Sequence, residues 1–324
     1  MMRVVSLLPS ATEVLCAIPG GGAMLAGRSH ECDFPPRLES GVAIESIPAL
    51  TSQRTHATSS ADIDRQVREA LHANAGEGAS ASSSASASLY ALDEERLRAL
   101  KPDVILTQDL CDVCSIDLNT VRRIAAGMTQ QPRIVSLNPK SLEDVFDDVL
   151  RVGEAIGLRA AAQETVVALR ERYWSARDFV NPYIEGPEVG FLEWMDPLFC
   201  AGHWTPQLIE TAGGRHTLNK TGSKSRRISP EELLEVMPQR LIICPCGYTI
   251  EQTQREMPTL VAQRWWKMLP AVQDGQVVIV DGSAMFNRPG PRLIDAYCWL
   301  VAWLNDRPEV LPEGFPVETA PAPK

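Results

Sequence analysis

The fold is decided near the amino terminus by Arg3-Val-Val-Ser-Leu-Leu8, which is followed by Pro9 and by the stretch Ser10 to Ile18. The first run has the short apolar pattern of a buried strand. The second has the pattern of a helix that is entered through Pro9-Ser10. A strand, a tight turn and a helix at the start of a chain are typical of an α/β protein.

The same alternation returns further along the chain. A helix is predicted from Asp93 to Leu100, and buried strands are predicted at Asp103 to Thr107 and Arg133 to Leu137. Another strand, Glu188 to Glu193, opens a second α/β unit. This alternation predicts parallel sheets that are covered by helices.

Two helices are expected between these units. Ser141-Leu-Glu-Asp144 resembles a capping box, and Gly157 ends the helix that it starts. Residues 159 to 179 then contain no Gly or Pro, and a helix of this length spans roughly 30 Å.

A faint internal repeat relates the two halves. Residues 93–106 and 229–242 share the order of N-cap, short helix, proline and buried strand, at a constant offset of 136 residues. One interpretation is two similar lobes joined by the helix at 159–179, and the other is that any helix–proline–strand unit has this layout. On the first interpretation the chain divides into an α/β lobe (1–140), connecting helices (141–182), a second α/β lobe (183–311) and a tail (312–324). Residues 75–88 are Ser/Ala-rich and are expected to form a flexible loop.

Composition excludes several classes of partner. The 324 residues have a net charge of −10 and a pI near 5.1, which argues against nucleic acid and against an anionic membrane surface. Eight cysteines in a chain of this length do not suggest a disulfide framework. No apolar run reaches the roughly 18 residues of a spanning helix, and Pro9, Ser10, Thr12 and Glu13 interrupt any leader-like segment. We therefore expect a cytoplasmic protein without membrane insertion.

Polar side chains follow the predicted strands, which is where open parallel sheets bind ligands. The candidate ligand-binding residues are Ser10, Thr12, Glu13, His30, Glu31, Cys32, Gln108, Trp194, Asp196, His203, Trp204, Arg288 and Arg292. Aromatic side chains beside polar groups suit a large, flat and partly apolar ligand, and the two arginines suit its acidic groups.

Cysteines also follow these strands. Cys111 and Cys114 form a Cys-x-x-Cys pair, and Cys244 and Cys246 form a Cys-x-Cys pair. Thiolates from Cys32, Cys111, Cys114 and Cys246 are candidate ligands for zinc or iron, together with nearby histidines. The alternative is that these cysteines are reduced and merely structural. The sequence contains no nucleophile elbow, zinc-protease helix or phosphate-binding loop, so the residues indicate no reaction.

Three segments resemble a known family. They are Val4-Val-Ser-Leu-Leu-Pro-Ser-Ala-Thr-Glu13, Gly27-Arg-Ser-His-Glu-Cys-Asp-Phe-Pro35 and Ser88-Leu-Tyr-Ala-Leu-Asp-Glu-Glu-Arg-Leu97. The chain is similar over nearly all of residues 2 to 310 to the helical-backbone metal receptors, which bind vitamin B12, iron–siderophores and haem. The branch that it resembles most is labelled cobalamin-binding.

The resemblance implies two Rossmann-like α/β lobes joined by one long helix, with the ligand held between them. Our leading interpretation is a non-catalytic binding protein for a corrinoid or another metal chelate, in which His30, Glu31 and Cys32 lie at the floor of the cleft or act as an axial or direct ligand. The lack of a recognisable export signal argues against delivery to an ABC transporter. The alternatives are a zinc- or iron-dependent enzyme on the same scaffold and a partner-binding module that has lost its ligand. The ligand, any directly bound metal, any reaction and the oligomeric state are not determined by the sequence.

Overall fold

The computed structural model describes residues 2–53, 59–75, 90–109 and 116–320. The Ser/Ala-rich segment and the Cys111/Cys114 pair fall almost entirely outside these residues. The described chain forms two compact units, and the division between them falls between Ala168 and Leu169. That point lies inside α6 (Arg159–Arg177), the long helix expected from the sequence. Unit 1 comprises most of the residues before this point, and unit 2 comprises Leu169–Lys324 with the short segments Ser59–Ala61 and Lys140–Glu143.

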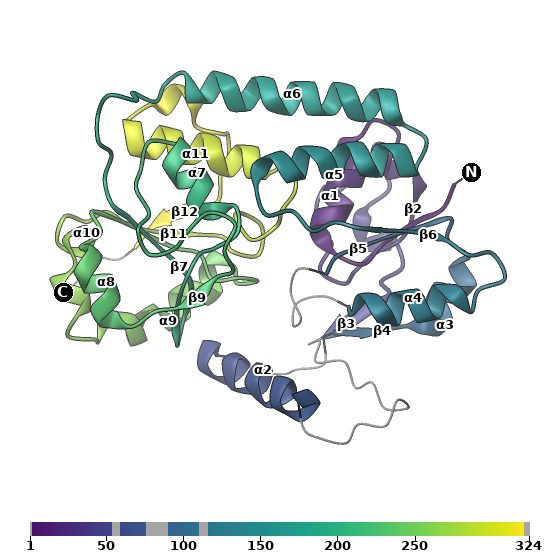
Figure 1. The fold of residues 1–324 in the computed structure, drawn as a ribbon, viewed down its shortest axis with the longest axis horizontal. Helices are drawn as coiled ribbons and strands as arrows, with labels where there is room; N and C mark the ends of the chain where they lie inside the picture. The colour runs from purple at the N-terminus through teal and green to yellow at the C-terminus, as the bar shows by residue number, and fades with distance from the viewer. Residues whose placement is uncertain (1, 54–58, 76–89, 110–115, 321–324) are drawn as a thin grey trace. The chain divides into compact units, whose positions relative to one another are not determined.

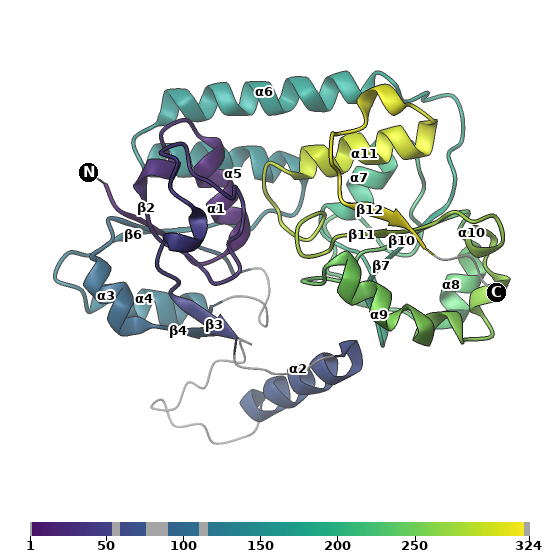
Figure 2. The ribbon, with the colours of Figure 1, turned by 180° about the vertical axis from the view of Figure 1, so that it is seen from behind.

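Unit 1 is built on a parallel sheet of four strands in the order β2-β1-β5-β6. The strands are β1 (Val4–Ser6), β2 (Leu25–Gly27), β5 (Val104–Thr107) and β6 (Arg133–Ser136). Both Figures 1 and 2 show α5 (Leu142–Ala155) on one side of this sheet and α3 (Glu94–Leu100) and α4 (Leu118–Ala126) on the other. Two further strands, β3 (Thr51–Gln53) and β4 (Tyr90–Leu92), form a separate antiparallel ribbon. The other helices in this part of the chain are α1 (Pro9–Ala17), α2 (Ser60–Ala75), η1 (Gly22–Met24) and η2 (Ile44–Ser46).

Unit 2 contains a mixed sheet of six strands in the order β12-β11-β10-β7-β8-β9. Its central strands β7 (Val189–Met195), β10 (Arg240–Ile243) and β11 (Val277–Val280) are parallel, as expected. The outer strands β8 (Leu198–Cys200), β9 (Arg226–Arg227) and β12 (Val317–Thr319) are antiparallel, which the sequence did not predict. The helices are α7 (Thr205–Thr211), α8 (Pro230–Val236), α9 (Ile250–Val261), α10 (Pro270–Gln273), α11 (Leu293–Asn305), η3 (Trp266–Met268) and η4 (Pro308–Val310).

The internal repeat predicted from the sequence is confirmed in the backbone. Asp93 and Ser229 cap the first turns of α3 and α8 by accepting hydrogen bonds from the amides of Arg96 and Glu232. Both helices end in a left-handed residue with φ 46°, Lys101 in the first and Met237 in the second. A proline and a buried strand follow each of them. Each lobe therefore uses the same helix–turn–strand unit.

A buried acid on α5 gives unit 1 a pH dependence. The Asp148 side chain is 4% exposed and pairs with Arg151 at 2.8 Å, while its Oδ2 has no hydrogen-bond partner among the described residues. Burial raises the pKa of Asp148 to about 6, although Arg151 lowers it. The unfolded pKa is about 3.9, so the stability that Asp148 contributes in its protonated form is present below about pH 4 and is lost as the pH rises through about 6.

Asp148→Asn should therefore become more stable relative to wild type as the pH rises from about 4 to 7, by at most roughly 3 kcal/mol. Urea unfolding at several pH values measures this difference. Asp147→Asn on the same helix is the matched control, because Asp147 is exposed. A difference between wild type and Asp148→Asn that does not change with pH would contradict the prediction.

Candidate ligand-binding site

The turn after β1 contributes three of the predicted site residues, and all of them are buried. Ser10, Thr12 and Glu13 lie on α1 with exposures of 3% or less. Thr12 Oγ1 lies 3.0 Å from the sulfur of Cys32, which is buried in the loop after β2. The structure thus brings Thr12 and Cys32 together, and this contact ties the loop after β2 to α1.

His30 lies in the same loop, and Thr51 of β3 determines its orientation. Thr51 Oγ1 accepts a hydrogen bond from the backbone N–H of His30 at 3.0 Å and donates its own hydrogen to Ser29 Oγ at 3.0 Å. His30 Nδ1 lies 2.7 Å from the same Thr51 oxygen. When the Thr51 hydroxyl donates to Ser29, Nδ1 is the donor to Thr51. The neutral imidazole then carries its proton on Nδ1, and Nε2 keeps its lone pair.

The Nε2 atom of His30 is available for a ligand. No hydrogen-bond partner for it lies within the described ranges, and the ring is half-buried with its edge against Tyr90 at 5.1 Å between centroids. Burial lowers the pKa of His30, Glu31 opposes this shift, and Arg28 adds to it. The imidazole is consequently neutral near pH 7, which is the form that binds a metal ion.

A buried arginine, Arg28, connects the loop that holds His30 to neighbouring segments by hydrogen bonds. The Arg28 guanidinium donates hydrogen bonds of 2.9–3.3 Å to the backbone carbonyls of Ser29, His30, Ile44, Glu45 and Ile47. Tyr90 donates its hydroxyl to Glu31 Oε1 at 2.7 Å. A ligand at His30 would therefore meet a side chain whose position is fixed before binding.

The remaining predicted residues of unit 1 follow β5. Gln108 is half-buried, and the next backbone amide, that of Asp109, donates to Asn138 Oδ1 at 2.7 Å. Cys111 and Cys114 lie outside the described residues.

In unit 2 the carboxyl end of β7 is joined to the loop after β10, and that loop is joined to the loop after β11. The amide of Cys246 donates to the carbonyl of Glu193 at 3.1 Å, and Asn287 Nδ2 donates to the carbonyls of Cys244 and Gly282. Position 282 requires glycine, because a Cβ there would lie 1.9 Å from the carbonyl oxygen of Pro245. The backbones of these segments are therefore closely packed at this edge of the sheet.

The aromatic residues of unit 2 differ in accessibility. Trp204 is buried, and its indole N–H donates to the carbonyl of Phe286 at 2.6 Å. Trp194 is half-buried and donates to the carbonyl of Asp196 at 3.1 Å, while the Asp196 side chain is exposed. His203 is half-buried against Trp204.

The two candidate arginines of unit 2 lie before and at the start of α11. Arg288 is buried, Arg292 is half-buried, and both interact with other groups of the chain.

No group of three or more His, Cys, Asp or Glu side chains placed to hold a metal ion occurs in the part of the chain that the structure describes. Of the candidate thiolates, Cys32 belongs to unit 1 and Cys246 to unit 2, and the other two are not described. The thiolate metal site stays a prediction.

Thr51 and Tyr90, which contact His30 and Glu31, are not among the site residues predicted from the sequence. Both belong to the β3–β4 ribbon, and each is separated from its partner by more than twenty residues. Nothing in the local sequence around either residue indicates the contact.

The match to a family model covers most of the chain. Residues 4–284 match the model described as "Periplasmic binding protein". The chain belongs to the periplasmic binding protein family.

Solved structures of this family share the two-lobe α/β fold with this chain. One is the periplasmic vitamin B12 binding protein BtuF of Vibrio cholerae, which has 18% sequence identity and a TM-score of 0.63, with 94% of this chain and 97% of that chain covered. Another is the periplasmic heme-binding protein RhuT from Roseiflexus sp. RS-1, with 19% identity, a TM-score of 0.64 and coverages of 94% and 98%. A third, a periplasmic heme binding protein from Pseudomonas aeruginosa, has 18% identity, a TM-score of 0.67 and coverages of 99% and 96%.

These identities are low enough that the likeness shows the fold alone. No curated protein is similar enough to the chain to count as a match. Among the described residues, no helix has both the length and the apolar character needed to cross a membrane.

Proposed function

We propose that this periplasmic-binding-protein family member binds a corrinoid or a related metal chelate, and that His30 Nε2 occupies an axial position on the chelated metal. The observation that supports this most strongly is the 2.7 Å contact between His30 Nδ1 and Thr51 Oγ1, because it occupies the inner nitrogen of the ring and leaves Nε2 to provide the lone pair that a metal ligand needs. The Nδ1–H to Thr51 contact is the kind of outer hydrogen bond that orients metal-bound histidines.

The family and the similar structures favour a chelate over a free ion. Solved structures with this fold include a vitamin B12 binding protein and heme-binding proteins. A chelate supplies the in-plane ligands of its metal itself, so the protein needs to provide only one or two axial groups. A single well-placed imidazole in unit 1 meets that need, whereas a free metal ion would require three or four protein ligands.

Titration of the purified protein with aquocobinamide and with haemin tests this function. Both chelates have exchangeable axial positions, and each should give a saturable change in its visible absorption at one equivalent per chain. Dicyanocobinamide is the matched control, because cyanide occupies both of its axial positions, and it should bind much more weakly. The absence of a saturable change with both aquocobinamide and haemin would overturn the proposal.

A further inference from the structure

A basic segment of unit 2 differs from the acidic composition of the chain. Residues 220–227, Lys-Thr-Gly-Ser-Lys-Ser-Arg-Arg, carry four cationic side chains and no acidic one, whereas the whole chain has a net charge of −10. All of these residues except Ser225 are exposed. We call residues 220–227 the basic strip. Cations this close to one another repel, so the strip is a candidate surface for an anionic partner.

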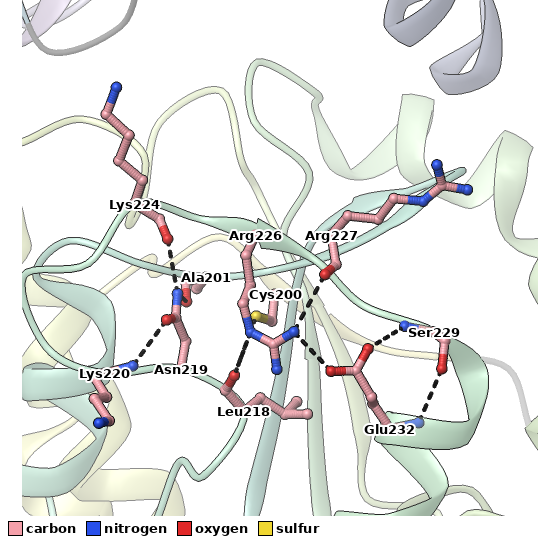
Figure 3. A network of polar contacts seen from close by, with 10 residues as sticks. All are labelled: Cys200, Ala201, Leu218, Asn219, Lys220, Lys224, Arg226, Arg227, Ser229 and Glu232. Carbon is pink, nitrogen blue, oxygen red and sulfur yellow. Dashed lines mark hydrogen bonds and ion pairs between the residues drawn. The ribbon is translucent and has the colours of Figure 1, made fainter.

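Hydrogen bonds anchor the basic strip to neighbouring segments of unit 2. Asn219 Nδ2 donates to the carbonyls of Ala201 and Lys224, both at 3.0 Å, so one amide joins the strip to the residues that precede α7 (Figure 3). Ser225 Oγ donates to Glu193 Oε2 at 2.8 Å. Because this backbone is held in place before binding, a partner loses little affinity to ordering it.

Three of the four cations in the strip have no acidic partner in the described part of the chain. No carboxylate there forms an ion pair with Lys220, Lys224 or Arg227. Arg226 is different, because it pairs with Glu232 at 2.7 Å. In Figure 3 the side chains of Lys224 and Arg227 extend away from the Arg226–Glu232 pair. These charges are therefore available to a partner.

Arg227 also lines a cavity, which lies entirely within unit 2 and has a volume of about 540 Å³. The rim of this cavity is polar and includes the exposed residues Thr259 and Gln263, so the cavity opens at the surface. Its interior is apolar, with the half-buried Trp265 on one wall. The buried lining residues belong to the hydrophobic core of unit 2 and are Met195, Leu198, Ile228 and Leu260. We call this cavity the apolar pocket, and its volume is that of a typical ligand pocket.

We propose that the basic strip and the apolar pocket together bind an acidic segment of a partner protein that carries one large apolar side chain. Arg227 joins the two parts, because it belongs to the strip and lines the pocket. An apolar side chain buried in a pocket supplies most of the affinity of such an interface. Carboxylates beside it meet the cations of the strip, which orients the segment and speeds its encounter with the protein.

The apolar pocket favours a protein segment over other anions. A nucleic-acid backbone and a lipid headgroup present phosphate to the strip, but neither offers an apolar side chain to fill the pocket. This inference goes beyond the proposed function and does not depend on it, since it requires no chelate and uses residues of unit 2 alone.

The test uses two fluorescein-labelled heptapeptides with amidated carboxyl termini, followed by fluorescence anisotropy at low ionic strength. One has a tryptophan between two runs of three glutamates, and the other has a glycine in place of the tryptophan. The wild-type protein should bind the tryptophan peptide saturably and the glycine peptide at least about fivefold more weakly, as expected for loss of an anchoring side chain. Added salt should weaken binding of both peptides.

Three variants assign this binding to the strip and to the pocket. Lys224→Gln and Arg227→Gln should each weaken binding of the tryptophan peptide by up to about fivefold, the effect expected for one exposed charge pair. Thr259→Trp places a large side chain at the rim of the pocket and should make the two peptides bind equally. Arg122→Gln is the control and should bind as wild type does, because it removes an exposed arginine from α4 in unit 1. All four positions are exposed, so the variants should fold.

The proposal fails if the wild-type protein does not bind the tryptophan peptide, or if it binds the tryptophan and glycine peptides equally. It also fails if Lys224→Gln, Arg227→Gln and Thr259→Trp bind both peptides as Arg122→Gln does. A heptathymidylate has the same charge as the peptides. If it binds as tightly as the tryptophan peptide and is weakened by the same variants, the strip is a general anion site and the assignment to a protein segment is wrong.

Discussion

Replacing His30 with alanine should abolish the absorption change that accompanies binding of aquocobinamide or haemin. The variant lacks the imidazole lone pair, and no other group within the described residues is oriented as His30 is by Thr51 and Tyr90. Loss of the metal ligand itself should cost more affinity than the roughly 10- to 100-fold that loss of an outer hydrogen bond to a ligating histidine costs. Titration followed by visible absorption measures both the affinity and the spectral change.

Two variants at Thr51 separate metal ligation from a structural effect. Thr51→Val removes the acceptor for Nδ1–H and should weaken binding by about 10-fold or more. Thr51→Ser keeps the hydroxyl and should bind nearly as wild type does. Thermal unfolding of His30→Ala shows whether the variant is folded. A folded His30→Ala protein with wild-type affinity and spectrum would contradict the assigned role.

Replacing Phe191 with alanine should cause a large loss of stability in unit 2. Phe191 lies on the central strand β7, is 0% exposed, and packs edge-to-face on Phe286 at 5.1 Å between ring centroids. Removing a buried phenyl ring leaves a cavity, and the expected cost is about 3–5 kcal/mol in the free energy of unfolding. Urea unfolding followed by circular dichroism measures this value.

The same substitution should weaken a hydrogen bond of Trp204, one of the candidate ligand-binding residues. The carbonyl of Phe286 accepts the hydrogen bond from the indole of Trp204, so a shift of Phe286 into the cavity weakens that contact. Leu311→Ala is the control, because Leu311 is 50% exposed and its truncation should change stability by about 0.5 kcal/mol or less. A loss below about 1 kcal/mol for Phe191→Ala would show that the core of unit 2 repacks around the cavity.

The elements that the sequence predicted best are those with local signals. The helix from Asp93 to Leu100 and the strand after it were predicted within a residue, because an N-cap, a proline and an apolar run mark their limits. The counterpart in unit 2 has the same signals and the same backbone, including left-handed residues at Lys101 and Met237. Signals within the segment itself are therefore sufficient to predict the bounds of such a unit.

The parts that the sequence did not predict depend on long-range contacts. The strand predicted from the sequence ends at Glu193, whereas β7 continues to Met195 and the chain returns as β8 after a turn at Asp196-Pro197. A strand of three residues is too short for its periodicity to be recognised. In the site, His30 was predicted as a candidate metal ligand, but its tautomer depends on Thr51, which lies in a different element. The covalent sequence around His30 contains no information about that hydrogen bond.

The measurement that tests the central claim most directly is the electron paramagnetic resonance spectrum of the protein with one equivalent of cobalt(II) cobinamide. Cobinamide has no nucleotide base of its own, so an axial nitrogen must come from the protein. We predict that the cobalt signal of the wild-type complex is split by one nitrogen nucleus and that this splitting is lost in His30→Ala. A wild-type spectrum identical to that of cobinamide in buffer would contradict the assignment of His30 as the metal ligand.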